Sequence, residues 1–146
     1  MINRSDLENF WTRGDIHTRI QKAMSEAGLN DKKLEIEDLF PIDQYHARGI
    51  AATVDLGKRM PISENQRIID IGCGLGGPAR YFAKQFKCLI TGIDITPSFI
   101  EIGNKFNNLT SMSKKVSLQI GNGENLDFED EACLLYTSPS PRDFTE

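Results

Sequence analysis

A cluster of glycines directly after a short β-branched run is the feature that most constrains how this chain can fold. Residues 67–71 read Arg-Ile-Ile-Asp-Ile and predict a strand. Four glycines follow within six residues: Gly72, Gly74, Gly76 and Gly77. Apolar residues then recur at helical spacing: Ala79, Phe82, Ala83 and Phe86. A strand, a glycine turn and a helix in this order bring backbone N–H groups to the carboxyl end of a strand, where open α/β sheets bind ligands.

The same alternation of strand and helix continues after the glycine turn. A second predicted strand covers 88–93 and ends at Asp94, and Thr96 is expected to cap a helix with Pro97 in its first turn. The inner face of that helix is expected to carry Phe99, Ile102, Phe106 and Leu109. A third strand is predicted at 116–120. The chain therefore reads as an α/β protein that carries the N-terminal half, three strands, of a Rossmann-like doubly wound parallel sheet.

A helical segment precedes this sheet in the sequence. One helix is predicted at 15–27 with Gly28 as its left-handed cap, and its apolar positions are Ile16, Ile20, Ala23 and Ala27. Pro41 is expected to break the following pattern and Asp43 to cap a second helix that ends near Met60. The apolar stripe of that second helix would be Ala47, Ile50, Ala51 and Val54. We therefore divide the chain into a helical lead and lid at 1–60, a partial Rossmann-like domain at 61–131 and a tail at 132–146.

The glycine spacing fits two cofactors. Gly72, Gly74 and Gly77 match the G-x-G-x-x-G pattern of dinucleotide sites. Gly72, Gly74 and Gly76 match the G-x-G-x-G pattern of S-adenosylmethionine sites. Asp94 lies 20 residues past Gly74 in both interpretations and offers two acceptor oxygens to a ribose. A pyrophosphate beside Asp70 would be repelled, whereas an ammonium or sulfonium would be attracted. Asp70 therefore favours S-adenosylmethionine over NAD(P), and an oxidoreductase or a non-catalytic fragment remains the alternative.

Three segments together resemble the class I S-adenosylmethionine-dependent methyltransferases, namely 68–77, 91–96 and 121–128. The resemblance is to the small-molecule branch that includes ubiquinone/menaquinone-biosynthesis, tocopherol and sarcosine/dimethylglycine methyltransferases. It implies transfer of a methyl group to a small-molecule acceptor, with the three glycines of the second pattern bordering the methionyl moiety. It further implies that Asp94 binds the ribose and that residues 122–124 meet the adenine, with Asn122 in place of the usual aspartate.

The resemblance completes the set of candidate residues. Candidate cofactor-binding residues are Asp70, Gly72, Cys73, Gly74, Gly76, Asp94, Ile95, Asn122, Gly123 and Glu124. Segment 42–49 resembles the lid of this branch, which makes Tyr45 and His46 candidates for covering the cofactor or touching substrate. No catalytic base is identifiable. Cys73, Cys88 and Cys133 form no C-x-x-C, so neither a metal site nor a disulfide framework is predicted.

Charge and hydropathy restrict the partners of the chain. The 17 basic and 21 acidic side chains give a net charge of −4 without a basic patch, which argues against nucleic acid and anionic membranes as partners. No apolar run approaches the ~18 residues of a membrane span, and charged residues near the start argue against a secretory signal. We therefore expect a cytoplasmic protein. Nothing in the sequence indicates its oligomeric state.

The last segment departs from the family pattern. After residue 130 the methyltransferase pattern would continue into a fourth strand and the region that positions the acceptor. Instead, residues 132–143 include Ser-Pro-Ser-Pro, which suits neither strand nor helix. We interpret 132–146 as a non-native or disordered tail, and we expect the chain to be a truncated methyltransferase without activity of its own.

Overall fold

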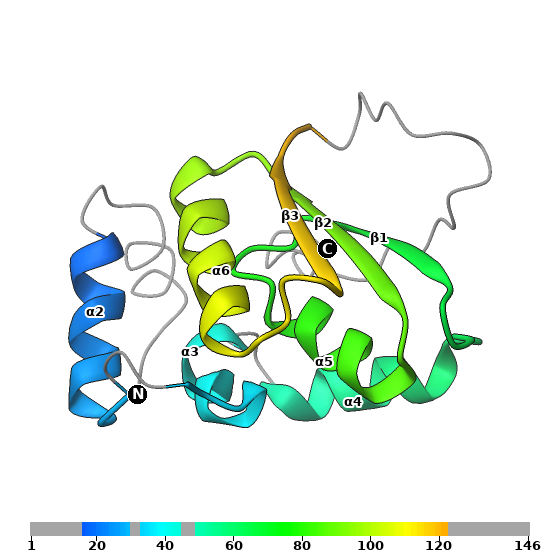
Figure 1. Cartoon of the computed structure of the whole chain (residues 1–146), viewed down its shortest axis with the longest axis horizontal. Coiled ribbons are helices and arrows are strands. Elements are labelled where there is room, and N and C mark those ends of the chain that lie inside the picture. Colours follow the sequence, from blue (N-terminus) through cyan, green and yellow to red (C-terminus); the bar gives the residue numbers. More distant parts are fainter. Residues whose placement is uncertain (1–15, 30–32, 45–48, 123–146) are drawn as a thin grey trace, which may run out of the picture. The chain divides into compact units, whose positions relative to one another are not determined.

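The computed structural model describes residues 16–29, 33–44 and 49–122 of the chain (Figure 1). The chain divides into two compact units, 1–32 and 33–146. This division falls earlier than the predicted boundary at residue 60. Residues 33–60, which the sequence analysis groups with the helical lead, belong to the same unit as the sheet because their helices pack against α5 (Gly77–Phe86).

The first unit contains helix α2 (Ile16–Glu26), close to the predicted helix at 15–27. Its buried side chains are Ile16, Ile20 and Met24, spaced four residues apart, whereas the predicted position Ala27 is exposed. The left-handed cap is confirmed, since Gly28 has a φ of +73°. The Gly28 and Leu29 amides donate to the carbonyls of Ser25 and Met24, the pair of bonds that closes a helix with a Schellman motif.

The second unit is built on three parallel strands, β1 (Arg67–Ile71), β2 (Leu89–Asp94) and β3 (Val116–Ile120), in the order β1-β2-β3. This confirms the predicted α/β class and the three strands of the first half-sheet. The register pairs Asp70 with Gly92, and Gly92 with Leu118. The carboxyl ends of the three strands therefore lie side by side, and the glycine turn leaves the sheet at the end of β1 (Figure 1).

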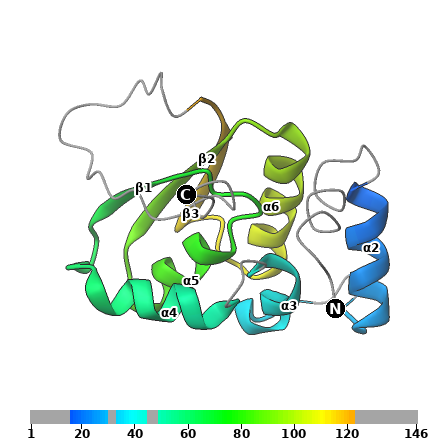
Figure 2. The same ribbon diagram turned by 180° about the vertical axis from the view of Figure 1, so that it is seen from behind.

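Helices α5 (Gly77–Phe86) and α6 (Pro97–Leu109) cover one face of this sheet (Figure 1 and Figure 2). The core between them and the strands is apolar; its members include Ile68, Ala79, Phe82, Ile90, Ile100, Val116 and Leu118. Each large apolar side chain that is fully buried contributes roughly 1.5–3 kcal/mol to stability relative to its exposed state. The strands and helices predicted from the sequence therefore share one apolar core, and this core fixes the position of the glycine turn between β1 and α5.

The segment before the helix at Ile50–Arg59, α4, differs from its prediction at Pro41 and Asp43. Pro41 does not end a helix: it lies in the first turn of α3 (Phe40–Asp43), where its missing N–H group has no intrahelical partner to lose. Asp43 does not cap the following helix. It is the last residue of α3, which follows the 3-10 helix η1 (Ile36–Leu39), and its side chain is buried.

Helix α4 (Ile50–Arg59) ends where the sequence predicts, but it buries a different face. Ala51 is exposed and Val54 is half-buried, while Thr53 and Gly57 are buried; Ala47 lies outside the described residues. Gly57 is buried because the rings of Phe82 and Phe86 come within 3.1–3.2 Å of the position its Cβ would take. Among the described helices, none is long and apolar enough to cross a membrane.

Candidate functional site

The glycine turn has a backbone that side chains rarely allow. Gly72, Gly74 and Gly76 have φ values of +75°, +56° and +84°, all in the left-handed region that favours glycine. The Gly76 amide donates to the Cys73 carbonyl at 2.9 Å, which closes the turn before α5 begins. Three of the four glycines are thus required by conformation, and the turn directs its backbone toward the carboxyl end of the sheet.

Strand β2 supplies the groups that anchor the turn. The amides of Gly72 and Cys73 both donate to the Ile93 carbonyl, at 2.7 and 3.1 Å. Asp94, at the end of β2, accepts from the Gly74 amide at 3.0 Å through Oδ2. A single residue pair at the end of β2 therefore holds the first three peptide units of the turn.

Asp94 also organises the start of α6. Its Oδ1 accepts from the Thr96 amide at 2.9 Å, while the Thr96 side chain, at the predicted N-cap position, makes no capping hydrogen bond. The Asp94 side chain is half-buried, and each carboxylate oxygen has a second lone pair. The carboxylate can therefore accept hydrogen bonds from a ligand at this edge of the sheet without releasing its two amides.

Asp70 and Cys73 occupy the interior side of the turn. Asp70 is completely buried at the end of β1, and Cys73 is 3% exposed. Burial raises the pKa of the Cys73 thiol above its usual range, and the negative charges of Asp70 and Asp94 raise it further. The predicted site residues on this side thus lie beneath the turn rather than on its surface.

The neighbouring strand ends expose apolar surface beside Asp94. Ile95 and Ile120 are the exposed large apolar side chains of the described residues, at 62% and 61%. The Gly121 amide donates to the Asp94 carbonyl at 3.0 Å, so the segment after β3 lies against the end of β2. Asn122 is exposed there. The predicted residues Tyr45, His46, Gly123 and Glu124 lie outside the described residues.

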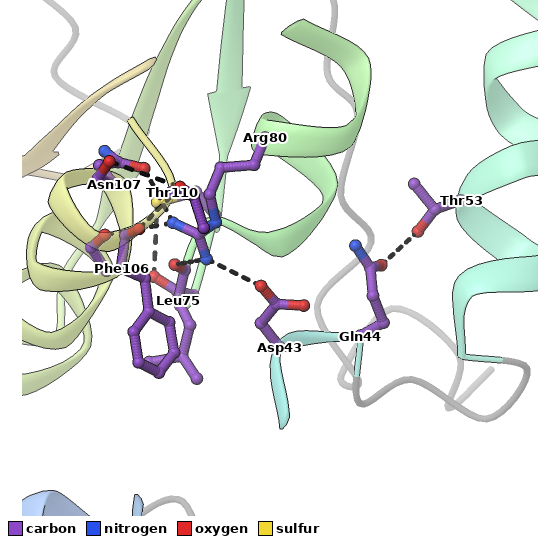
Figure 3. A network of polar contacts seen from close by, with 11 residues as sticks. Asp43, Gln44, Thr53, Leu75, Arg80, Phe106, Asn107 and Thr110 are labelled. Atoms are coloured by element: carbon purple, nitrogen blue, oxygen red, sulfur yellow. Dashed lines mark hydrogen bonds and ion pairs between the residues drawn. The ribbon is translucent and has the colours of Figure 1, made fainter. Parts of the chain in front are cut away.

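A buried arginine that the sequence analysis did not identify lies behind the turn (Figure 3). Arg80, on α5, is 0% exposed. Its Nη2 donates to the Leu75 carbonyl at 2.6 Å and to Asp43 Oδ2 at 3.0 Å. Leu75 stands between the second and third glycines of the turn, so Arg80 connects the turn to α3.

The other end of the same guanidinium binds α6. Nη1 donates to the Gly103 carbonyl at 3.1 Å and to Asn107 Oδ1 at 2.9 Å, and the Phe106 ring lies 5.5 Å from Cζ. Asn107 in turn donates through Nδ2 to the Val116 carbonyl at 3.1 Å. Arg80 therefore joins α3, the glycine turn, α6 and, through Asn107, β3.

The ion pair is held in a low-dielectric environment. Burial raises the pKa of Asp43 to about 6, an effect that the charge and hydrogen bond of Arg80 partly offset. Burial likewise lowers the pKa of Arg80, and Asp43 opposes that shift. At neutral pH the carboxylate and the guanidinium are both charged. Each offsets part of the desolvation cost of burying the other.

Comparison with known proteins gives the family. The sequence model of the methyltransferase domain family matches residues 68–141. This match includes the turn, the three strands and part of the segment set apart at 132–146, whose boundary stays a prediction.

Individual relatives of the chain are also described as methyltransferases. The chain is 35% identical over 77 residues to a sterol 24-C-methyltransferase of Debaryomyces hansenii, which covers 53% of this chain and 20% of that protein. It is 35% identical over 80 residues to a probable chloroplastic tocopherol O-methyltransferase of Oryza sativa subsp. japonica, covering 55% of this chain and 21% of the other. The chain thus spans about a fifth of the length of these curated relatives.

Solved structures share the fold. A geranyl diphosphate C-methyltransferase from Streptomyces coelicolor A3(2), solved with Mg²⁺, geranyl-S-thiolodiphosphate and S-adenosyl-L-homocysteine, has a TM-score of 0.56 at 19% identity. The alignment covers 57% of this chain and 31% of that one. The family match favours the methyltransferase interpretation over the oxidoreductase alternative. Because the family model covers half of the sequence, the chain belongs to the methyltransferase domain family.

Proposed function

We propose that this chain carries the cofactor-binding part of an S-adenosylmethionine-dependent methyltransferase that acts on a small-molecule acceptor. The observation that carries the proposal is the pairing of the glycine turn with Asp94, whose carboxylate bonds to the Gly74 amide and keeps acceptor capacity. The relatives support it by their names, since they are described as methyltransferases of a sterol and of tocopherol.

The charges around the turn suit a cationic ligand better than an anionic one. Asp70 lies directly before the turn and Asp94 beside it. The nearest cation in the sequence, Arg80, is fully buried and its Nη atoms donate to Asp43 and to protein carbonyls. A pyrophosphate would meet the Asp94 carboxylate here and would also be repelled by the charge of Asp70, which is buried beneath the turn, whereas an ammonium and a sulfonium would be attracted.

The described residues would divide the work of binding. The backbone of the glycine turn would border the methionyl part of the cofactor, Asp94 would accept from the ribose hydroxyls, and exposed Ile95 would offer apolar contact to the adenine. When bound, the cofactor supplies a methyl group on positively charged sulfur to a nucleophilic atom of the acceptor. The contribution of the protein is mainly positioning and exclusion of water. We assign no catalytic base.

Other parts of the proposal rest on the sequence alone. Asn122, Gly123 and Glu124 would meet the adenine, and Tyr45 and His46 would cover the cofactor or touch the acceptor. A cytoplasmic location and the absence of a nucleic acid partner also stay predictions.

Calorimetry with two cofactors tests the proposed function. We expect the chain, or a longer protein that contains it, to bind S-adenosylmethionine or S-adenosylhomocysteine and to bind NAD⁺ far more weakly, because the carboxylates at the turn repel a pyrophosphate. The measurement is isothermal titration of the same protein with each ligand. Clear binding of NAD⁺ with no binding of either sulfur ligand would overturn the assignment.

Asp94 provides a second test. Asp94→Ala should weaken S-adenosylhomocysteine binding by about 1.5–3 kcal/mol, or about tenfold to more than a hundredfold in Kd. Such a loss is expected because the ribose hydroxyls lose a charged acceptor and the Gly74 amide loses its partner. Glu64→Ala is the control, since Glu64 is exposed in the loop before the amino end of β1. Equal and negligible effects of the two substitutions would remove Asp94 from the site.

A further inference from the structure

Three segments that are distant in the sequence meet at one buried cation. The Arg80 guanidinium contacts Asp43 of α3, the Leu75 carbonyl in the glycine turn, and Gly103 and Asn107 of α6 (Figure 3). Burying a guanidinium costs much solvation energy, and a packed apolar side chain would fill the same space without that cost. The stability of the fold alone therefore does not explain why a guanidinium with four hydrogen bonds is buried at this position.

The bond to Leu75 holds the part of the turn that the strands do not reach. The amides of Gly72 and Cys73 are fixed by the Ile93 carbonyl and that of Gly74 by Asp94. On the far side of the turn, Arg80 Nη2 fixes the Leu75 carbonyl at 2.6 Å. A carbonyl lies in the plane of the peptide that follows it, so this bond orients the peptide unit between Leu75 and Gly76.

The surrounding glycines make room for this arrangement. A Cβ on Gly76 would lie 3.0 Å from Arg80 Nη1, and a Cβ on Gly103 would lie 2.8 Å from the Leu75 carbonyl oxygen. A Cβ on Gly77 would overlap the backbone carbonyl of Asp43. Gly77 and Gly103 have no left-handed φ that would by itself require glycine, so at these two positions close approach is the reason for glycine. Glycines therefore let the backbone of α5 approach α3 and that of α6 approach the turn, beside the guanidinium that bonds to all three segments.

We infer that Arg80 is a positioning residue for the cofactor site, which orients the Leu75–Gly76 peptide of the turn and makes cofactor affinity depend on Asp43 of α3. This inference rests on the proposed function, because it takes the glycine turn as the place where S-adenosylmethionine binds. Asp43 and Arg80 act through the turn and need not touch the ligand.

A paired apolar replacement separates positioning from stability. In the double variant Asp43→Leu/Arg80→Met both charges disappear together, and replacing a buried ion pair in this way is often neutral or stabilising. We expect the double variant to lower Tm, because the Leu75 and Gly103 carbonyls and Asn107 Oδ1 lose their donor, but by less than a single substitution that leaves one charge unpaired. We expect its Kd for S-adenosylhomocysteine to rise about tenfold or more, because the turn loses its charge-assisted bond.

The control uses a second ion pair of α5, which joins it to η1 rather than to α3. Lys84, one turn further along α5, lies 3.3 Å from Glu37 of η1 and 3.5 Å from Glu35, on the surface. Lys84→Gln should change neither Tm nor Kd measurably. Arg80→Lys is the second test variant: it keeps the charge beside Asp43, but its single nitrogen does not fill both Nη positions, so binding should again weaken.

Hydrogen exchange of the unliganded protein gives a readout that needs no cofactor. The amides of Gly74 and Gly76 should exchange about tenfold faster in the double variant than in the wild type, the change expected when one charge-assisted bond is lost. A wild-type protein that binds no S-adenosylhomocysteine would refute the proposed function, and the exchange rates would still decide whether Arg80 positions the turn. Wild-type affinity and wild-type exchange in a folded double variant, or in Arg80→Lys if the double variant does not fold, would overturn the inference.

Discussion

Asp43→Ala is expected to lower the free energy of unfolding by about 3–5 kcal/mol, the loss typical of removing one partner from a buried ion pair. Asp43 is 2% exposed and its Oδ2 lies 3.0 Å from Arg80 Nη2. Without the carboxylate, the guanidinium stays in the interior with only neutral acceptors around it. Domains of this size have a total stability of about 5–15 kcal/mol, so the variant should be close to unfolding. Urea denaturation at pH 7, followed by circular dichroism, measures the change.

Glu37→Ala is the control for this measurement. Glu37 belongs to the neighbouring η1 and pairs with Lys84 of α5, but both side chains are about half exposed. An ion pair of this kind contributes about 1 kcal/mol or less. If Asp43→Ala and Glu37→Ala cost the same, the buried pair contributes no more than a surface contact.

Phe106→Ala should cause a loss of similar size, about 3–5 kcal/mol, because it removes a fully buried aromatic ring. The Phe106 ring is 0% exposed and lies 5.5 Å from the guanidinium carbon of Arg80. Alanine would leave a cavity in the interior and would remove the favourable contact between the ring and the cation. The same urea titration measures the loss.

Leu109→Ala is the matched control for Phe106. Leu109 is the last residue of α6 and is half-buried, so its truncation should cost roughly 1 kcal/mol, about half the value of a fully buried leucine. A loss from Phe106→Ala no greater than that from Leu109→Ala would mean that the core relaxes around the missing ring.

The sheet unit was predictable because local signals in the sequence agree with its tertiary structure. β-Branched runs predicted β1 and β3 with their observed bounds, and glycines marked the turn that three left-handed φ values require. Helix α4 shows where such signals fail. Its apolar stripe predicted burial of Ala51, but the structure buries Thr53, which donates to Gln44 at 2.7 Å, and Gly57, which admits two phenylalanine rings. Both are tertiary contacts that spacing along one helix does not encode.

Of the candidate site, the sequence predicted the glycine turn and the strand end that lies beside it, but not the contacts behind the turn. The glycine spacing and the position of Asp94 after a strand identified two elements that the structure joins by a hydrogen bond. Arg80 was missed because an arginine in a helix is usually a surface residue. Asp43 was interpreted as a helix cap because a charged side chain is usually exposed rather than buried. The available signal was the set of glycines around them, since the space left at Gly77 and Gly103 is taken by Asp43 and by the Leu75 carbonyl, two of the acceptors of the guanidinium.

Cys73 stands between the first two glycines of the turn, and its thiol is kept from ionising. Burial raises its pKa, and the charges of Asp70 and Asp94 act in the same direction, so the sulfur carries its proton at neutral pH. The thiolate, rather than the thiol, is the nucleophile in alkylation and in disulfide exchange. A methylated sulfonium is itself an alkylating agent. If S-adenosylmethionine binds at the turn as proposed, the buried and protonated Cys73 would therefore not compete with the acceptor for the methyl group.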